Sequence, residues 1–410
     1  MKNTVKNTFA SFQIRNFRLY FFGQGLSLSG TWVQTIALTW LILQLTHSGT
    51  QLGLVLAAQF LPMLIFGVWG GVITDRFNKR HILYITQTIQ GVLALILGLL
   101  VLTHHIHVWM VYVLATSLGC TQVVDNPTRQ TFVIEMVGSN YLKNAVTLNS
   151  MMVNVARIIG PSIAGILIAT VGIGECFLIN AASFVAVLIA LVLMRANELH
   201  TIRPVSKQKG QIKDGLFYIW ENPILRATLV MMFIIGTFAY EFPVILPLFA
   251  TRTLHGNAAT YSAMTAAMGI GAVVGGLYTA GRGVPVASTL VKVALAFGVA
   301  IILMAFMPDL FATLLTLVAL GVLSVLFITF GNTTLQLTSQ PHMRGRVMSL
   351  WSIAFLGTTP IGGPIIGFLA DHTNPRVGLA IGGFSALIGA AIGALIIRGR
   401  VVSLPNSAQG

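Results

Sequence analysis

The chain has 410 residues, of which 55% are apolar and only 8% are charged, and its mean hydropathy is +0.85. This composition excludes a soluble globule, because the apolar surface would exceed what one core can cover. The formal net charge of +14 comes from Lys and Arg between the apolar runs, so no nucleic-acid partner is needed to explain it.

Apolar runs follow one another along the whole chain, and each is close to the ~20 residues that a membrane-spanning helix needs. The first run is too long for a cleavable signal peptide and is expected to remain as the first span. The sequence therefore predicts an all-α membrane protein with twelve transmembrane helices. The twelve runs are 18–44, 51–74, 82–103, 108–128, 145–170, 176–194, 224–250, 259–280, 287–306, 310–337, 347–370 and 377–397.

Lys and Arg are distributed unevenly between the two sides of the membrane. If the N-terminus is cytoplasmic, the outer loops hold only Arg252 and Arg376, whereas the cytoplasmic segments hold most of the other Lys and Arg residues. The excess of Lys and Arg inside predicts that both termini are cytoplasmic.

The two halves of the sequence resemble each other. Two patterns recur about 206 residues later: Asn16 with Gly30-Thr31 as Asn222 with Gly236-Thr237, and Gly70-Gly71 with Thr74 as Gly275-Gly276 with Thr279. Parallel repeats of this kind predict two six-helix bundles with the substrate path between them. We expect residues 1–194 and 223–410 to form the bundles, and residues 195–222 to form a cytoplasmic linker with a short interfacial helix that includes Ile212, Leu216 and Trp220.

A charged loop, residues 71–80, separates the second and third spans. It contains Asp75, Arg76, Lys79 and Arg80, and its cations favour the cytoplasmic face. Asp75 can reach the N-terminal amides of a neighbouring helix and so act as a latch. Alternatively, the loop only fixes the topology.

The fourth span ends in Asp125-Asn126-Pro127-Thr128-Arg129. Asp125 can pair with Arg129 one turn later, or Arg129 can reach Asp75 across the bundle. One interpretation is an inner gate formed by Asp75, Arg76, Arg80, Asp125 and Arg129. The other is a capped helix end.

Arg157 and Glu241 fall deep inside spans, where a charge is costly and marks a candidate substrate or proton site. Arg157 lies near the middle of the fifth span, although it could instead bond carbonyls freed by Pro161. Glu241 lies in the outer half of the seventh span and is a candidate proton carrier, or else a mouth residue in contact with water. Polar candidates on the same path are Gln34, Asn154 and Tyr240.

No catalytic centre, metal site or bound cofactor is expected. His104, His105 and His107 have no Cys or carboxylate beside them, and Cys120 and Cys176 lie in apolar runs. No nucleotide-binding loop is present that would indicate an ATP-driven pump, and the carboxylates form no hydrolytic arrangement. The energy source is therefore expected to be the proton gradient.

The loop Gly71-Val72-Ile73-Thr74-Asp75-Arg76-Phe77-Asn78-Lys79-Arg80 resembles the signature between helices two and three of the major facilitator superfamily. Asn78 stands where that family often has glycine. Gly160-Pro161 with Gly165 is similar to the antiporter motif in the fifth helix of exporters of this superfamily. Further segments resemble its enterobactin-exporter and macrolide-efflux branch: Asn16-Phe17-Arg18-Leu19-Tyr20, Gln59-Phe60-Leu61-Pro62, Asp125-Asn126-Pro127-Thr128-Arg129-Gln130, Leu178-Ile179-Asn180-Ala181-Ala182-Ser183-Phe184 and Met343-Arg344-Gly345-Arg346-Val347-Met348.

This resemblance implies a proton antiporter that exports small amphipathic molecules, such as drugs or siderophores, by alternating access. It would work as a monomer in the inner membrane of a bacterium, with lipid and a small-molecule substrate as its partners. Glu241 stands where an uncharged polar residue is expected in that branch. The alternatives are an importer of a nutrient anion, an exporter of one narrow class of metabolite, and a non-transporting membrane sensor.

Overall fold

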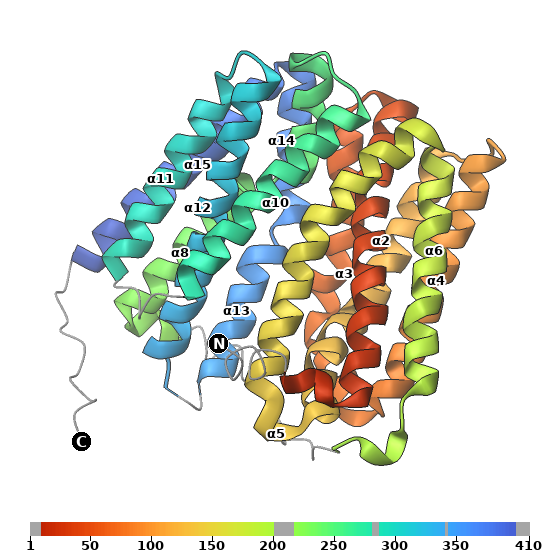
Figure 1. Cartoon of the computed structure of the whole chain (residues 1–410). Helices are drawn as coiled ribbons and strands as arrows, with labels where there is room; N and C mark the ends of the chain where they lie inside the picture. Colours follow the sequence, from red (N-terminus) through yellow and green to blue (C-terminus); the bar gives the residue numbers. More distant parts are fainter. Residues whose placement is uncertain (1–9, 201–216, 281–286, 341–342, 399–410) are drawn as a thin grey trace, which may run out of the picture.

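The computed structural model describes residues 10–200, 217–280, 287–340 and 343–398 (Figure 1). These residues form helices and no strands. Eleven helical segments among them are long and apolar enough to cross a membrane, and one of these, α5, contains two crossings. The predicted all-α fold with twelve membrane helices is therefore confirmed.

The first half contains a short 3-10 turn, η1 (Ala10–Gln13), and five long helices: α2 (Arg15–Thr46), α3 (Gly49–Arg76), α4 (Lys79–Leu102), α5 (Val108–Thr170) and α6 (Ile173–Leu193). Two of the starts follow from N-cap chemistry. The side chain of Ser48 accepts from the amide of Gln51, and that of Asn78 accepts from the amide of His81, so α3 and α4 begin directly after these residues.

Helix α5 differs from the predicted pattern of two short spans separated by a loop. Its 63 residues correspond to roughly 95 Å at 1.5 Å per residue, about three bilayer cores. It turns at Gly138, the one residue in it with non-helical dihedrals (φ 67°, ψ 179°), a conformation that glycine adopts readily. The segment 129–144, expected as a loop, is therefore helical on both sides of Gly138.

The second half begins with α8 (Pro223–Phe238), which Asn222 caps, and α9 (Phe242–Leu248), which continues into a π turn labelled η3 (Phe249–Thr253). Its other helices are α10 (Ala258–Ala280), α11 (Ala287–Ala305), α12 (Leu310–Thr338), α13 (Arg344–Leu356), α14 (Thr359–His372) and α15 (Pro375–Arg398). The seventh span is thus interrupted at residues 239–241, and the eleventh at residues 357–358.

The linker between the halves is described only at its ends. A 3-10 turn, η2 (Ala196–Glu198), follows α6, and residues 217–221 are helical. The predicted interfacial helix falls partly here: Trp220 is exposed at the surface, whereas Ile212 and Leu216 lie outside the described residues.

The two halves meet along two helix pairs, α3 with α14 and α5 with α10. In Figure 1 the helices of the two halves lean together toward α14 and apart toward the lower edge of the view. We call the end that carries residues 46–49 the capped end, and the end that carries the charged loop 76–79 the basic end. Helix α14, which reaches the capped end, makes most of the contact with α3, and α13 makes little.

Backbone-to-backbone packing at the α3–α14 contact depends on glycine. Gly49 and Gly53 of α3 face Gly367 and Gly363 of α14, respectively, so closely that a side chain at Gly53 would overlap the carbonyl of Gly363, and one at Gly367 that of Gly49. We call these four residues the glycine seam. Small residues four positions apart allow close helix packing in membranes, where lipid gives no hydrophobic drive for association.

Candidate functional site

The charged residues predicted at the end of the fourth span are joined in one buried cluster. Asp125 is 0% exposed, and its Oδ1 accepts hydrogen bonds from Thr86 Oγ1 at 2.7 Å and Gln87 Nε2 at 2.8 Å. Its Oδ2 lies 2.7 Å from Arg129 Nε, one helical turn later. Of the two predicted pairings, the structure contains the local pair of Asp125 with Arg129. The hydrogen bonds from Thr86 and Gln87 connect Asp125 of α5 to α4.

The basic residues of the charged loop also bind within the first half. Arg80 donates to the carbonyl of Leu191 through Nη2 at 2.6 Å and Nε at 2.9 Å, and its guanidinium lies 5.6 Å from the ring of Tyr84. Lys79 forms an ion pair of 2.6 Å with Glu135. These contacts fasten the start of α4 to α6 and α5.

Asp75 and Arg76 end helix α3 at the basic end. Arg76 is exposed and Asp75 is half-buried. The preceding residue, Thr74, is buried, and its hydroxyl lies 2.9 Å from that of Thr128 on α5. The end of α3 is therefore packed against the same stretch of α5 that contains the Asp125 cluster.

Arg157 lies on the part of α5 that borders the second half. Its guanidinium lies 5.7 Å from the ring of Trp32 on α2, and its Nε is buried without a hydrogen-bond partner among the described residues. A Cβ atom placed on Gly269 of α10 would lie 3.0 Å from the carbonyl oxygen of Arg157, so the two helix backbones are in close contact here.

The residues of the antiporter-type motif lie at the same border. Gly160 is pressed against Ser29 and Trp32 of α2, and Gly165 against Ser262 of α10. Pro161 lies inside the helix, and the backbone dihedrals remain helical there. The motif thus allows α5 to contact α2 and α10 at once.

Tyr240 and Glu241 lie at the break between α8 and α9. The hydroxyl of Tyr240 donates to the carbonyl of Ser324 at 3.0 Å, and its ring lies 5.3 Å from that of Phe297 and 5.4 Å from that of Phe355. These contacts of Tyr240 are all with residues of the second half.

Glu241 is 2% exposed and faces helix α14. A Cβ atom on Gly363 would lie 3.3 Å from Glu241 Oε2. Oε1 is buried without a partner among the described residues. The alternative of a mouth residue in contact with water does not fit this conformation.

The remaining predicted polar candidates bind to their own half. Gln34 Oε1 accepts from Asn180 Nδ2 of α6 at 2.7 Å. Asn154 Nδ2 donates to the carbonyl of Ser150, one turn earlier in the same helix, at 2.9 Å. Both side chains are thus satisfied by the first half in this conformation.

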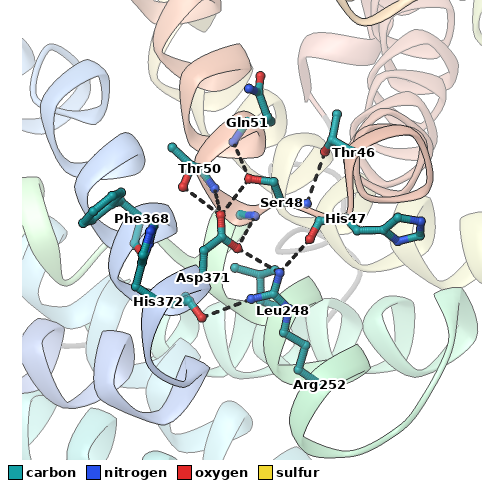
Figure 2. A network of polar contacts seen from close by, with 12 residues as sticks. Thr46, His47, Ser48, Thr50, Gln51, Leu248, Arg252, Phe368, Asp371 and His372 are labelled. Atoms are coloured by element: carbon teal, nitrogen blue, oxygen red, sulfur yellow. Dashed lines mark hydrogen bonds and ion pairs between the residues drawn. The ribbon is translucent and has the colours of Figure 1, made fainter.

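The sequence analysis missed a network at the capped end (Figure 2). The carboxylate of Asp371, at the end of α14, accepts hydrogen bonds from the amides of Gly49 at 2.7 Å and Thr50 at 2.8 Å. It also accepts from the hydroxyls of Ser48 and Thr50, both at 2.7 Å. A side chain of the second half therefore caps the N-terminus of a helix in the first half, where a negative charge is favoured.

Arg252 completes this network from η3. Its guanidinium donates to Asp371 Oδ1 at 2.8 Å, to the carbonyl of Ala370 at 3.0 Å and to the carbonyl of His47 at 2.7 Å (Figure 2). We call Asp371, Arg252 and residues 47–50 the capping network. A cavity of about 260 Å³ borders it, lined by Trp40, Leu43, Gln44, His47, Leu248, Thr251 and Arg252.

A sequence signal for this network does exist. On α14 the residues Gly363, Gly367 and Asp371 are spaced by four, and Gly49 and Gly53 have the same spacing at the start of α3. Such spacing places the three residues of α14 on one face of that helix, and the two residues of α3 on one face of α3. It does not reveal that the two faces meet, because they are more than 300 residues apart in the chain.

No group of three or more His, Cys, Asp or Glu side chains suited to a metal ion occurs within the described ranges. Cys120 is exposed and Cys176 is buried, and both are free thiols.

Comparison with known proteins identifies relatives over most of the chain. The chain is 26% identical to the multidrug efflux pump Tap of Mycolicibacterium fortuitum, over 84% of this chain and 86% of that protein. It is 25% identical to the enterobactin exporter EntS of Salmonella paratyphi A, over 93% and 91%. A staphyloferrin A transporter of Staphylococcus aureus is 32% identical, but the match covers only 42% of this chain and 45% of that protein.

Solved structures share the fold at low sequence identity. A POT family transporter in complex with 5-aminolevulinic acid superposes with a TM-score of 0.76 at 12% identity, over 95% of this chain and 97% of that one. A bacterial homologue of the lysosomal transporter Spinster gives a TM-score of 0.73 at 15% identity, over 93% and 96%. The family model described as transmembrane secretion effector matches residues 6–405. The chain therefore belongs to this family of major facilitator superfamily membrane transporters, and it is not an enzyme.

Proposed function

We propose that this transporter exports small amphipathic molecules, such as drugs or siderophore-like compounds, in exchange for protons. It would act as a monomer in the inner membrane of a bacterium, with both termini in the cytoplasm. Relatives named as an efflux pump and as an exporter support the direction of transport. The excess of Lys and Arg supports a cytoplasmic position for the basic end.

Alternating access would occur between the two halves. If the basic end is cytoplasmic, the glycine seam and the capping network would close the outer end. Toward the cytoplasm, α3 has few contacts with α13, so the two halves would be apart there. Asp75, Arg76, Arg80, Asp125 and Arg129 would form the inner gate when that end closes. Breaking hydrogen bonds at one end and forming them at the other is a small exchange of free energy, as alternation requires.

The buried carboxyl group of Glu241 is the observation that favours proton coupling. A charge at this depth is costly, so proton binding and release at Glu241 depend on whether water reaches it. Water would reach it when α14 moves away from α3, because Glu241 faces Gly362 and Gly363 behind the seam. Proton exchange and opening of the outer end would thereby be linked.

The test is dye and drug accumulation in cells that express the protein, Glu241→Gln or Glu221→Gln, with and without a protonophore. We expect the parent and Glu221→Gln to lower accumulation, and the protonophore to abolish this effect. Glu221 is an exposed carboxylate and serves as the matched control. Glu241→Gln should reduce pumping by about tenfold or more, the range in which loss of one general acid or base falls.

The same assay distinguishes the proposed exporter from the alternative functions. An importer of a nutrient anion raises accumulation above that of the empty vector, and a membrane sensor leaves it unchanged. A broad panel in which only one compound is pumped indicates an exporter of narrow specificity. Protonophore-insensitive efflux contradicts the proton antiport.

A further inference from the structure

Arg157 is a half-buried cation for which the described residues supply no counter-charge. Its side chain donates no hydrogen bond and forms no ion pair among these residues, and its Nε is buried. The contact that it makes is with the ring of Trp32, at 5.7 Å. A cation-π contact offsets only part of the cost of burying a guanidinium at membrane depth.

Five acidic side chains in the described parts of the chain are engaged away from Arg157. Asp125 pairs with Arg129 at 2.7 Å, Glu135 with Lys79 at 2.6 Å and Asp371 with Arg252 at 2.8 Å. Glu198 pairs with Arg195 at 2.9 Å, and Asp309 caps the start of α12 through the amide of Ala312 at 2.9 Å. Arg157 itself lies in the second leg of α5, between Gly138 and Thr170.

Glu241 is the acidic residue next to Tyr240, but it is directed toward another helix. Its oxygens are the atoms that a Cβ on Gly362 or Gly363 of α14 would meet, at 3.0 Å and 3.3 Å. In this conformation it therefore faces the seam and not Arg157.

The guanidinium of Arg157 lies 5.7 Å from the ring of Trp32, on α2 of the first half. Gly269 of α10, in the second half, lies against the backbone of Arg157. A ligand here would find one fixed positive charge beside a flat apolar surface.

We propose that Arg157 binds the carboxylate of the transported molecule, and that the substrates of this transporter are amphipathic anions with an aromatic or other flat apolar body. A carboxylate would form a charge-assisted, bidentate pair with the guanidinium, and the flat body would stack on the ring of Trp32. The proposal names the substrate class for the exporter proposed above and rests on that function.

The test is binding by the purified full-length protein of matched pairs of compounds that differ only in charge. Aromatic carboxylic acids, such as 1-naphthaleneacetate, are compared with their amides, such as 1-naphthaleneacetamide, by calorimetry in detergent. We expect acids to bind at least about tenfold more tightly than amides, the value of one hydrogen-bonded charge pair. Arg157→Gln should remove the preference, and Arg157→Lys should keep part of it.

Two controls separate binding from folding. Arg376→Gln removes a cation outside this site, at the start of α15, and should retain the preference for acids. Arg157→Gln should leave the melting temperature of the ligand-free protein unchanged or raised, because it removes an uncompensated buried charge.

The proposal is overturned if no acid in the panel binds better than its amide, including the case in which no acid binds, or if the preference survives in Arg157→Gln. A large loss of ligand-free stability in Arg157→Gln also contradicts it, since this would reveal a structural partner. Equilibrium binding does not depend on the proton gradient or on the direction of transport. Its failure is therefore distinguishable from failure of proton-driven export.

Discussion

Asp125 shows how far single residues could be interpreted from the sequence. Its pairing with Arg129 follows from their i, i+4 spacing, and the structure contains that ion pair. The hydrogen bonds from Thr86 and Gln87 could not be predicted, because they depend on how α4 packs against α5. Asp371 escaped prediction for the same reason, since its partners are backbone amides of a distant helix.

Loss of the buried carboxylate should destabilise the first half. Asp125→Asn leaves the partly buried Arg129 unpaired, and we expect a loss on the order of 2 kcal/mol, less than for a fully buried pair because Arg129 is partly solvated. Thermal unfolding of the purified protein would show a lower Tm.

The matched control is Glu198→Gln, which breaks an exposed pair with Arg195 and should leave Tm almost unchanged. The double variant Asp125→Asn with Arg129→Gln should recover part of the loss. Equal Tm values for Asp125→Asn and the parent would show that the pair contributes nothing to stability.

At the scale of elements, the number and type of helices were predictable. The positions of the interruptions, at Gly138 and at residues 239–241 and 357–358, were not all predictable. The turn in α5 falls at Gly138, whose φ of 67° glycine adopts readily, and residues 129–144 contain no proline that would stop the helix. Pro360 and Pro364 predict a break in the eleventh span, and the break occurs at residues 357–358, just before Pro360. Apolar periodicity alone does not locate such breaks.

The glycine seam gives a testable role to a packing contact. Gly367→Val places a branched side chain against the carbonyl of Gly49, so the closed outer end should become less stable. Spin labels at the exposed positions Thr170 and Asn257, at the ends of α5 and α10, should report an additional population at longer distance. Gly276→Ala, where an added Cβ meets nothing within 4 Å, is the matched control and should leave the distance distribution unchanged.

At the scale of the whole molecule, the internal sequence repeat predicts two helical bundles, residues 1–194 and 223–410, and this division stays a prediction. How the bundles are docked could not be predicted. The docking depends on Gly-to-Gly contacts and on the capping network, which join residues more than 300 positions apart.

Loss of the cap between the halves should favour opening of the outer end. Asp371→Asn removes the ion pair with Arg252 and weakens the bonds to the amides of α3. A cysteine in place of Leu248, which is 0% exposed and lines the neighbouring cavity, should then react with an impermeant maleimide on the order of tenfold faster. The measurement needs a Cys120→Ser background, because Cys120 is exposed.

Asp309→Asn provides the comparison for this experiment. Asp309 also caps a helix through its carboxylate, but the helix, α12, belongs to its own half. The labelling rate should therefore stay at the parent value. Equal acceleration by both variants would mean that helix capping, and not the contact between the halves, controls access.

The capping by Asp371 has a consequence for helix α3 itself. The amide protons of Gly49 and Thr50 are held by a carboxylate that belongs to the other half, and they would lose it if the halves separated at the capped end. Fraying of the first turn of α3 and separation of the halves would then be one event. The helix-end chemistry that governs an isolated peptide would contribute to the free energy of that separation.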